Sequence, residues 1–331
     1  GAAGSIGSEI VRQVVKYKPK KVVLLDQAES DLYDLNQELI AENDIVNWEV
    51  VIGDVTRKER MERVFHHFKP NLIFHAAAYK HVPLMELNPA ESIRTNVHGT
   101  KIMADLCVKF NVGKFVLIST DKAVNPTNVM GASKRIAEIY CQSLNDTTTT
   151  KFITTRFGNV LGSNGSVIPL FKKQLENGGP LTVTHPNVTR YFMTIPEACQ
   201  LVLEASTIGN GGEIYVFDMG KSIKIIDLAK KMIQLTGLQL NKDIEIKITG
   251  LRPGEKMYEE LLSNEENTVP THHPKILIGK VKPLKFDPTH QLVIELINLI
   301  ENQKNEEIVK QMKLIVPEFV SNNSEFSKFD N

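Results

Sequence analysis

Short apolar runs alternate with longer amphipathic segments through the first half of the chain. Runs rich in β-branched residues predict strands at 21–26, 49–52, 71–74, 114–119 and 152–156. Apolar residues at three- and four-residue intervals predict helices between them at 32–41, 57–67, 90–110 and 129–144. This alternation predicts an α/β fold, a Rossmann-type doubly wound parallel sheet covered on both faces.

The pattern becomes less regular after about residue 160. Strands are predicted at 181–184, 212–217 and 244–248, and helices at 195–206, 225–235 and 256–262. We therefore expect a smaller mixed α/β domain that shares a cleft with the first. The predicted boundaries are 1–177 for the larger domain, with 195–220 returning to it, 178–194 and 221–285 for the smaller, and 286–331 for a helical C-terminal tail with a frayed end.

Charge and cysteine content exclude several classes of protein. The 331 residues carry 39 basic and 39 acidic side chains, so no net charge attracts nucleic acid or an anionic membrane. Three widely spaced cysteines fit neither a disulfide framework nor a zinc site, and His272-His273 lacks a third ligand, so we predict no metal. No apolar stretch reaches bilayer length, and we expect a cytoplasmic protein.

The chain begins inside a glycine turn, with no strand before it. It therefore looks like a chain cut at its amino end. This leaves open an upstream membrane-anchoring region, in which case the residues here would be the cytosolic part of an anchored protein.

The opening turn predicts a dinucleotide site in the larger domain. Gly1, Gly4 and Gly7 are spaced as G-x-x-G-x-x-G and lead directly into a helical pattern, so the backbone N–H groups of Ser5 and Ile6 can approach a pyrophosphate. Asp26 ends the next strand, 19 residues after Gly7, where its carboxylate can accept from ribose hydroxyls and repel a 2′-phosphate. We therefore predict NAD, with NADP less favoured.

Residues after the next two strands support the same prediction. Asp54 and Val55 are placed to contact the adenine, and the small residues Ala76, Ala77 and Ala78 let a dinucleotide pass close to the backbone. The alternative is that these alanines only pack against a helix.

Polar residues with complementary chemistry follow the strand at 114–119. Thr120, Asp121 and Lys122 can supply a hydrogen-bond donor, a general acid and a general base. Lys134 lies one helical turn after Met130, near the start of the predicted helix at 129–144, and can reach back toward a nicotinamide ribose.

Several motifs together resemble a known family. The glycine turn, Asn96, Thr120 and the Met130/Lys134 pair look like an extended short-chain dehydrogenase/reductase. The segments that resemble the UDP-N-acetylglucosamine 4,6-dehydratases of capsule and glycan biosynthesis are 75–86, 119–131, 156–162, 189–194 and 252–256. The resemblance covers residues 1 to about 285 and implies NAD-dependent dehydration of a UDP-sugar, with Asn96 near the cofactor.

One departure from the superfamily affects the chemistry. Met130 occupies the position of a proton-shuttling tyrosine, and a thioether carries no proton. The resemblance implies that Asp121 protonates the departing carbon-6 hydroxyl, that Lys122 removes the carbon-5 proton, and that Thr120 and Lys134 hold the carbon-4 oxygen. For this, burial and a neighbouring cation such as Lys134 must lower the pKa of Lys122.

The smaller domain is expected to bind the substrate. Arg190 and Arg252 suit a bidentate grip on a diphosphate. The other candidate substrate-binding residues are Lys80, His81, Met130, Asn159 and Glu255.

Two alternative functions remain open at this point: a nucleotide-sugar 4-epimerase and an NAD-sensing module without turnover. The resemblance also implies a homo-oligomer, associated through the helices at 90–110 and 129–144.

Overall fold

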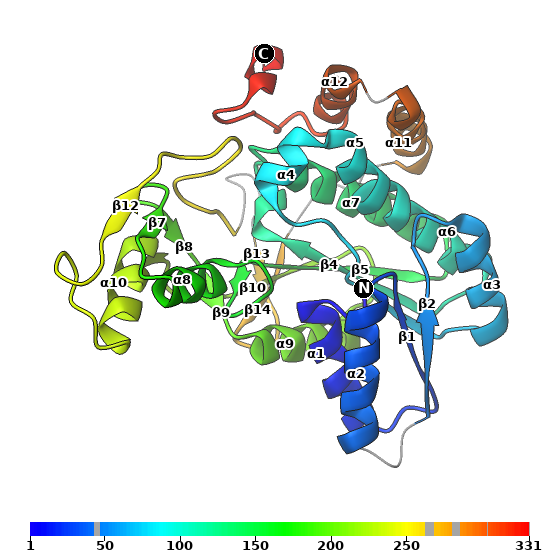
Figure 1. The fold of residues 1–331 in the computed structure, drawn as a ribbon. Coiled ribbons are helices and arrows are strands. Elements are labelled where there is room, and N and C mark those ends of the chain that lie inside the picture. Colours follow the sequence, from blue (N-terminus) through cyan, green and yellow to red (C-terminus); the bar gives the residue numbers. More distant parts are fainter. Residues whose placement is uncertain (43–46, 262–267, 280–284, 303, 331) are drawn as a thin grey trace.

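The computed structural model describes residues 1–42, 47–261, 268–279, 285–302 and 304–330. Its main sheet has six strands in the order β13-β14-β10-β5-β4-β3 (Figure 1). Their bounds are β3 (Leu72–His75), β4 (Lys114–Thr120), β5 (Lys151–Phe157), β10 (Ile214–Phe217), β13 (Thr268–Pro270) and β14 (Ile276–Gly279). Neighbouring strands from β3 to β10 are parallel, and β14 and β13 extend the sheet antiparallel.

A second parallel pair, β1 (Val22–Asp26) and β2 (Trp48–Ile52), lies beside the main sheet. The first residues of the chain lie between this pair and the end of β3. The amine of Gly1 donates to the carbonyl oxygen of Leu25 at 2.8 Å, and the glycine packs against the backbone of Ala77. The opening turn therefore lies at the carboxyl ends of two parallel strands.

Helices cover both faces of the sheet, so the predicted doubly wound α/β fold is confirmed. Helices α1 (Ser5–Lys16) and α9 (Ile195–Ile208) pack together on one face, and α2 (Glu29–Glu42) packs beside them against β1. Helices α3 (Lys58–Phe68), α6 (Thr100–Lys109) and α7 (Val129–Leu144) cover the other face. Asn128 starts α7, since its side chain accepts from the N–H of Gly131 at 2.7 Å.

The predicted helix at 90–110 is divided into three parts. After α4 (Val82–Leu87), the chain forms α5 (Pro89–Ser92), a π-helical turn η1 (Ile93–Gly99) and then α6. The Thr100 hydroxyl donates to the carbonyl oxygen of Asn96 at 2.7 Å within this wider turn. Single π-helical turns of this kind are frequent at functional sites.

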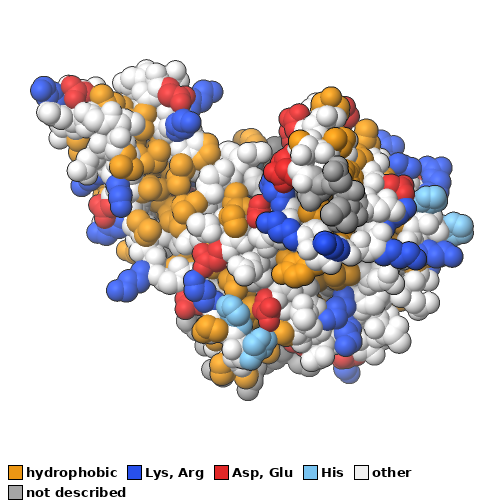
Figure 2. Space-filling view, turned by 90° about the horizontal axis from the view of Figure 1, so that it is seen from below, with side chains coloured by type: hydrophobic (Ala, Val, Ile, Leu, Met, Phe, Trp, Pro, Cys, Tyr) orange, Lys and Arg blue, Asp and Glu red, His pale blue; other side chains and the backbone are white. Residues whose placement is uncertain are grey.

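A smaller unit projects to the left in Figure 1. Its elements are β6 (Asn159–Val160), α8 (Val167–Glu176), β7 (Leu181–Val183), β8 (Thr189–Arg190), β9 (Phe192–Met193), β11 (Ile223–Lys224), α10 (Ile225–Leu235) and β12 (Ile246–Ile248). Its own core includes Phe171, Val183 and Ile233. Figure 2 shows this unit on the left of the view from below, with basic and acidic side chains interspersed over the face.

The predicted helix at 256–262 is not formed between 256 and 261, and position 262 lies outside the described residues. The backbone explains the difference. The carbonyl oxygen of Met257 accepts from the backbone N–H of Thr189 at 3.1 Å and from the Arg190 side chain at 3.4 Å. These tertiary partners replace the intrahelical partner, and the segment runs as an irregular loop.

The C-terminal segment consists of α11 (Phe286–Asn298), η4 (Ile300–Asn302), α12 (Asn305–Ile315) and η5 (Glu325–Phe329). The helices α11 and α12 pack on α7, at the top of Figure 1. The expected frayed end is wrong, because Phe319 and Phe326 are buried. The helix at 129–144, expected to meet another subunit, is thus largely covered by this chain's own helices. Among the described helices, none is long and apolar enough to cross a membrane.

Candidate active site

The main cavity, of about 710 Å³, lies between the two units. Its position at the carboxyl ends of the parallel strands is where ligands bind in open α/β sheets. The predicted residues that line it are Gly1, Gly4, Ser5, Ile6, Gly7, Ala76, Ala78, Lys80, His81, Thr120, Lys122, Met130, Lys134, Asn159, Arg190, Arg252 and Glu255. The predicted residues outside its lining are Asp26, Asp54, Val55, Ala77, Asn96 and Asp121.

The opening turn has no room for side chains at two of its glycines. A Cβ on Gly7 would lie 1.8 Å from the carbonyl oxygen of Gly1, and one on Gly1 would lie 2.4 Å from the nitrogen of Ala77. Gly4 has more space, since the nearest atom to its Cβ would be 3.6 Å away. Helix α1 then begins at Ser5, and Ser5, Ile6 and Gly7 line the cavity, so the N-terminal end of this helix lies there, as suits a pyrophosphate.

Asp26 holds the glycine turn in place. Its two carboxylate oxygens accept from the backbone N–H groups of Ala3 at 2.9 Å and Ala28 at 3.0 Å. Each oxygen keeps a lone pair for a ribose hydroxyl, so its role toward the cofactor stays a prediction. Asp54 accepts from the N–H of Thr56 at 2.8 Å and forms a local turn beside Val55.

Asn96 is fully buried behind the cavity wall. Its amide oxygen accepts from the N–H of Tyr79 at 2.8 Å, and its amide nitrogen donates to the Tyr79 carbonyl at 3.0 Å and to Ser133 Oγ at 2.9 Å. Both of its donors are therefore used within the protein. The side chain ties the loop after β3 to α7, which makes it a positioning residue.

Thr120, Asp121 and Lys122 form one hydrogen-bonded cluster at the end of β4. Asp121 Oδ1 accepts from the Thr120 hydroxyl at 2.9 Å and from Lys122 Nζ at 2.9 Å. Asp121 is fully buried, and among the described residues its Oδ2 has no partner. The short helix η2 (Asp121–Ala123) sets this geometry, because Thr120 Oγ1 also accepts from the Lys122 backbone N–H at 3.4 Å.

The charge environment of Lys122 differs from the expected one. Burial lowers the pKa of Lys122, but the carboxylates of Asp121 and Glu259 raise it, and the resulting pKa lies above its ordinary value. Arg190, and not Lys134, is the cation that opposes them. The expectation of a lowered pKa is therefore wrong. If Lys122 acts as a base, its neutral amine must form in another way than through a lowered pKa.

Lys134 has the lowered pKa instead. It is buried in α7 and donates from Nζ to the carbonyl oxygen of Ile118 at 2.7 Å. Burial lowers the pKa of Lys134 to about 8, against the opposing influence of Glu138 and Cys141. Met130, one helical turn earlier, is buried and lines the cavity where a tyrosine would otherwise supply a hydroxyl.

The candidate phosphate ligand Arg190 is already paired with two carboxylates. Its guanidinium lies 3.2 Å from Glu255 Oε1 and 3.6 Å from Glu259 Oε1. Arg252 is more exposed and contacts Glu255 Oε2 at 3.4 Å. Asn159 accepts from Lys122 Nζ at 3.3 Å, so it contacts the reactive cluster.

Lys80 and His81 line the cavity next to these groups. Partial desolvation lowers the pKa of Lys80, although the residue as a whole is exposed. Burial, Lys80 and Arg252 together lower the pKa of His81, which favours its neutral form.

A family described as polysaccharide biosynthesis proteins matches residues 1–281. The chain belongs to this family. It is 53% identical over 314 residues to the capsular polysaccharide biosynthesis protein CapD of Staphylococcus aureus, a match that covers 94% of this chain and 51% of that protein. The chain therefore spans about half the length of this curated relative.

Two further similarities extend this comparison. The UDP-N-acetylglucosamine 4,6-dehydratase (inverting) of Campylobacter jejuni is 34% identical over 272 residues, covering 81% of this chain and 77% of that protein. The X-ray structure of Pen from Bacillus thuringiensis shares the fold with a TM-score of 0.79 and 34% identity, over 92% of this chain and 96% of that chain.

Glu259 is a site residue that the sequence analysis of this family member missed. Its carboxylate is buried, lines the cavity, and lies 3.6 Å from Lys122 Nζ as well as from Arg190 Nε. Among the described residues its Oε2 has no hydrogen-bond partner. The sequence marks it only as one of two adjacent glutamates after the 252–256 motif, which is typical of a surface segment.

Glu138 was missed as well, because it lies inside a helix with no motif of its own. It forms a buried ion pair with Arg156 at 2.6 Å and accepts from the hydroxyl of Ser119, the residue before Thr120, at 2.6 Å. Arg156 strengthens the charged form and lowers the pKa of Glu138 against the opposing effect of burial. Through the hydrogen bond from Ser119, this ion pair holds the end of β4 in position.

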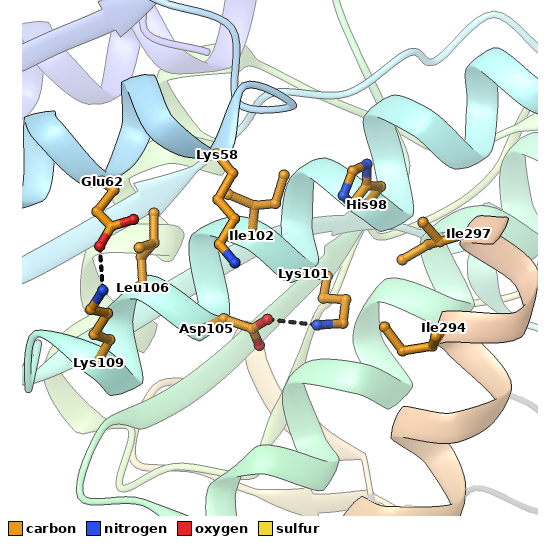
Figure 3. Close-up of a pocket in the computed structure, with 10 residues that line it drawn as sticks. All are labelled: Lys58, Glu62, His98, Lys101, Ile102, Asp105, Leu106, Lys109, Ile294 and Ile297. Carbon is orange, nitrogen blue, oxygen red and sulfur yellow. Dashed lines mark hydrogen bonds and ion pairs between the residues drawn. The ribbon is translucent and has the colours of Figure 1, made fainter. Parts of the chain in front are cut away.

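A second cavity, of about 350 Å³, lies between α3, α6 and α11 (Figure 3). Its charged side chains include two ion pairs, Glu62 with Lys109 and Asp105 with Lys101. Ile294 and Ile297 of α11 close one side of it. None of the predicted site residues lines this cavity, so we assign the chemistry to the main cavity.

Proposed function

We propose that this chain uses NAD to remove water from UDP-N-acetylglucosamine, giving a UDP-4-keto-6-deoxy sugar for polysaccharide biosynthesis. The observation that carries the proposal is the Thr120–Asp121–Lys122 cluster at the same cavity as the glycine turn. The activity named for the Campylobacter jejuni relative supports it.

The residues at the other end of the cavity fit a dinucleotide. Gly1 and Gly7 have no room for a Cβ atom. Because side chains are absent there, a pyrophosphate can approach the backbone N–H groups of the turn. Asp26, placed at the end of β1, favours ribose hydroxyls over a 2′-phosphate and therefore NAD over NADP. The chemistry supplied by bound NAD is the acceptance and later return of one hydride.

The raised pKa of Lys122 leads to a specific form of acid–base catalysis. Asp121 and Lys122 share a proton across a 2.9 Å hydrogen bond. Transfer of that proton from Lys122 to Asp121 creates a neutral carboxylic acid and a neutral amine in one step, with no proton lost to solvent. Desolvation works toward this neutral pair, whereas the carboxylates of Asp121 and Glu259 favour the ammonium form of Lys122, so the neutral pair is the minor, reactive state.

The proton balance closes over one turnover. Once carbon 4 is a ketone, the hydrogen on carbon 5 is acidic, and neutral Lys122 removes it. Protonated Asp121 gives its proton to the carbon-6 hydroxyl, which leaves as water. Lys122 then returns its proton to carbon 5 as carbon 6 receives the hydride. The proton released from the carbon-4 hydroxyl at the start passes to solvent, and Lys122 takes one proton from solvent after it has returned its own to carbon 5, which restores the pair.

Thr120 and Lys134 hold the carbon-4 oxygen in this scheme. The Thr120 hydroxyl donates to Asp121, and a turn of its hydroxyl redirects that donor to the sugar. Lys134, in its protonated form, stabilises negative charge that develops on the same oxygen.

The test is incubation of the chain with UDP-N-acetylglucosamine and NAD, followed by mass and NMR analysis. A product lighter by one water supports the proposal. A product of unchanged mass but altered configuration at carbon 4 would establish a 4-epimerase. Tightly bound NAD without any product would establish a sensing module, and either result overturns the dehydratase.

A further inference from the structure

The final described segment of the chain contacts the loop that carries Arg252 and Glu255, two residues of the cavity lining. We call residues 316–330 the C-terminal strap. It follows α12 and lies beyond residues 1–281, the part that matches the family. Phe319 and Phe326 anchor it, since both are buried in the apolar cluster that includes α7.

The strap holds the loop at 251–256 by three hydrogen bonds. The Asn322 side chain donates to the Glu255 carbonyl at 2.9 Å, and the Asn323 side chain donates to the Leu251 carbonyl at 2.9 Å. The Asn322 carbonyl accepts from the N–H of Gly254 at 2.7 Å. This loop carries Arg252 and Glu255, so the strap contacts the backbone of the candidate substrate ligands.

The strap also ties this loop to the start of α7. The backbone N–H of Asn322 donates to the Thr127 carbonyl at 3.0 Å, and the Thr127 hydroxyl donates to the Gly254 carbonyl at 3.0 Å. Ser324 Oγ donates to Glu86 Oε2 at 2.7 Å, while Glu86 Oε1 accepts from the N–H of Val129 at 2.6 Å. The strap therefore contacts three segments: the 251–256 loop, the residues before α7, and Glu86 of α4.

The loop is held by contacts with other segments, which include the strap and the side chains of Thr127 and Asn128, both of which donate to the Gly254 carbonyl at 3.0 Å. It contains no helix or strand, and Gly254 has a φ of +76°, a conformation that no regular element imposes. When only a fraction of molecules holds the binding conformation, the apparent dissociation constant rises by the inverse of that fraction. Contacts that fix the loop before the ligand arrives therefore strengthen binding.

From these contacts we infer that the C-terminal strap positions the 251–256 loop for the diphosphate end of a nucleotide-sugar. Asn322 and Asn323 are positioning residues in this account, because they act through the loop that carries Arg252. The inference rests on the proposed function, from which the class of ligand is taken. It assigns a role in substrate affinity to a segment outside the part that matches the family.

The test compares two variants of the whole chain. In the double variant Asn322→Ala/Asn323→Ala, the dissociation constant for UDP, measured by calorimetry, should rise about fivefold for each hydrogen bond removed. The KM for the nucleotide-sugar should rise in parallel, with kcat and NAD affinity unchanged. The matched control Lys328→Ala lies in the same strap but contacts Glu306 of α12, and should leave all four quantities unchanged.

Two outcomes overturn the inference. One is unchanged UDP affinity in the double variant. The other is an equal loss of UDP and NAD affinity together with a lower melting temperature, which would show a purely structural role. If the unaltered chain binds UDP but forms no dehydrated product, the proposed function fails while the UDP comparison still tests the strap. If it binds no UDP, both fail.

Discussion

The two ends of the main cavity are built from different materials. At the cofactor end, the wall is backbone and small side chains, and the glycine turn excludes a Cβ at Gly1 and Gly7. At the substrate end, the wall includes charged side chains from separate segments that pair with each other, beside apolar residues such as Leu170 and Val183. An end made of backbone has its final shape before a ligand arrives. An end made of ion pairs must exchange partners when an anionic ligand binds.

Arg190 illustrates the consequence at the substrate end. It lies within 3.6 Å of carboxylate oxygens from Glu255 and Glu259. A diphosphate that takes this guanidinium must displace at least part of those contacts, so binding is an exchange of anions. Selectivity at the substrate end then depends on how well a ligand's negative charge replaces the carboxylates at Arg190. Selectivity at the cofactor end depends on the space left by the glycines.

The largest effect is expected where the two ends meet, at the reactive cluster. Lys122→Ala removes the base and should lower kcat by about 10²–10⁴-fold, the usual range for a proton-transfer group. NAD binding should be unchanged, because the glycine turn lies on other elements. Single-turnover dehydration and NAD titration by fluorescence measure the two quantities separately.

Asp121→Asn is the matched control for this prediction. It keeps the shape of the side chain but cannot share the proton, so it should reproduce the loss of kcat with NAD binding intact. Normal water loss in Lys122→Ala would remove that residue from the mechanism. Loss of NAD binding in both variants would indicate a folding defect at the end of β4.

The cofactor end should respond to volume. In Gly7→Ala, the new Cβ would lie 1.8 Å from the Gly1 carbonyl oxygen, and the turn must shift. Overpacking of this kind should weaken NAD binding by about 10- to 100-fold. Gly4→Ala is the control, since its Cβ would have no neighbour closer than 3.6 Å. Unchanged NAD binding in Gly7→Ala would contradict the prediction, and an equal loss in Gly4→Ala would show that the cofactor itself approaches the Gly4 backbone closely.

The sequence predicts the elements of the cofactor end because those elements are local. The glycine spacing, the strand after it and the small residues after β3 are consecutive patterns, and the structure places most of them at the cavity. The start of α7 at Val129 also follows from a local feature, the Asn128 cap. Local hydrogen bonds and steric limits determine such elements without help from distant residues.

The substrate end depends on distant contacts. All seven predicted substrate-binding residues line the cavity, but the backbone path of this end and its buried Glu259 do not follow from the sequence. The 256–261 segment is an irregular loop because β8 takes the carbonyl of Met257. Glu259 joins the site only because the fold brings it to Lys122, and the strap packs because Phe319 and Phe326 find a cluster on α7. No pattern within these segments contains that information.

A smaller effect is expected from the titration of Lys134, with its pKa of about 8. Below that pH the ammonium is present and can stabilise the carbon-4 oxygen, and above it kcat should fall by about tenfold per pH unit at most. Lys134→Arg stays charged and should lack this alkaline limb, even if its overall rate is lower. A limb that persists in the variant would assign it to another group.

Linkage separates this effect from unfolding. The folded-state pKa of Lys134 lies below its ordinary value, so between the two values the unfolded chain binds more protons. The contribution of this group to stability therefore rises with pH from about 8 upward. A fall in kcat over that range without a fall in melting temperature would fit Lys134, whereas parallel loss of both would not.

The smallest effect is expected from Glu259→Gln, which removes one charge at the substrate end with little change in volume. Glu259 raises the pKa of Lys122, so its removal should move the acid limb of the rate profile to lower pH. Glu255→Gln is the matched control: it also frees Arg190 but lies outside the groups that shift Lys122. Both variants should change KM, and only the first should move the limb. If the acid limb stays at the same pH in Glu259→Gln, Asp121 alone controls the protonation of Lys122. The carboxylates of the substrate end would then affect only the binding of the diphosphate to Arg190.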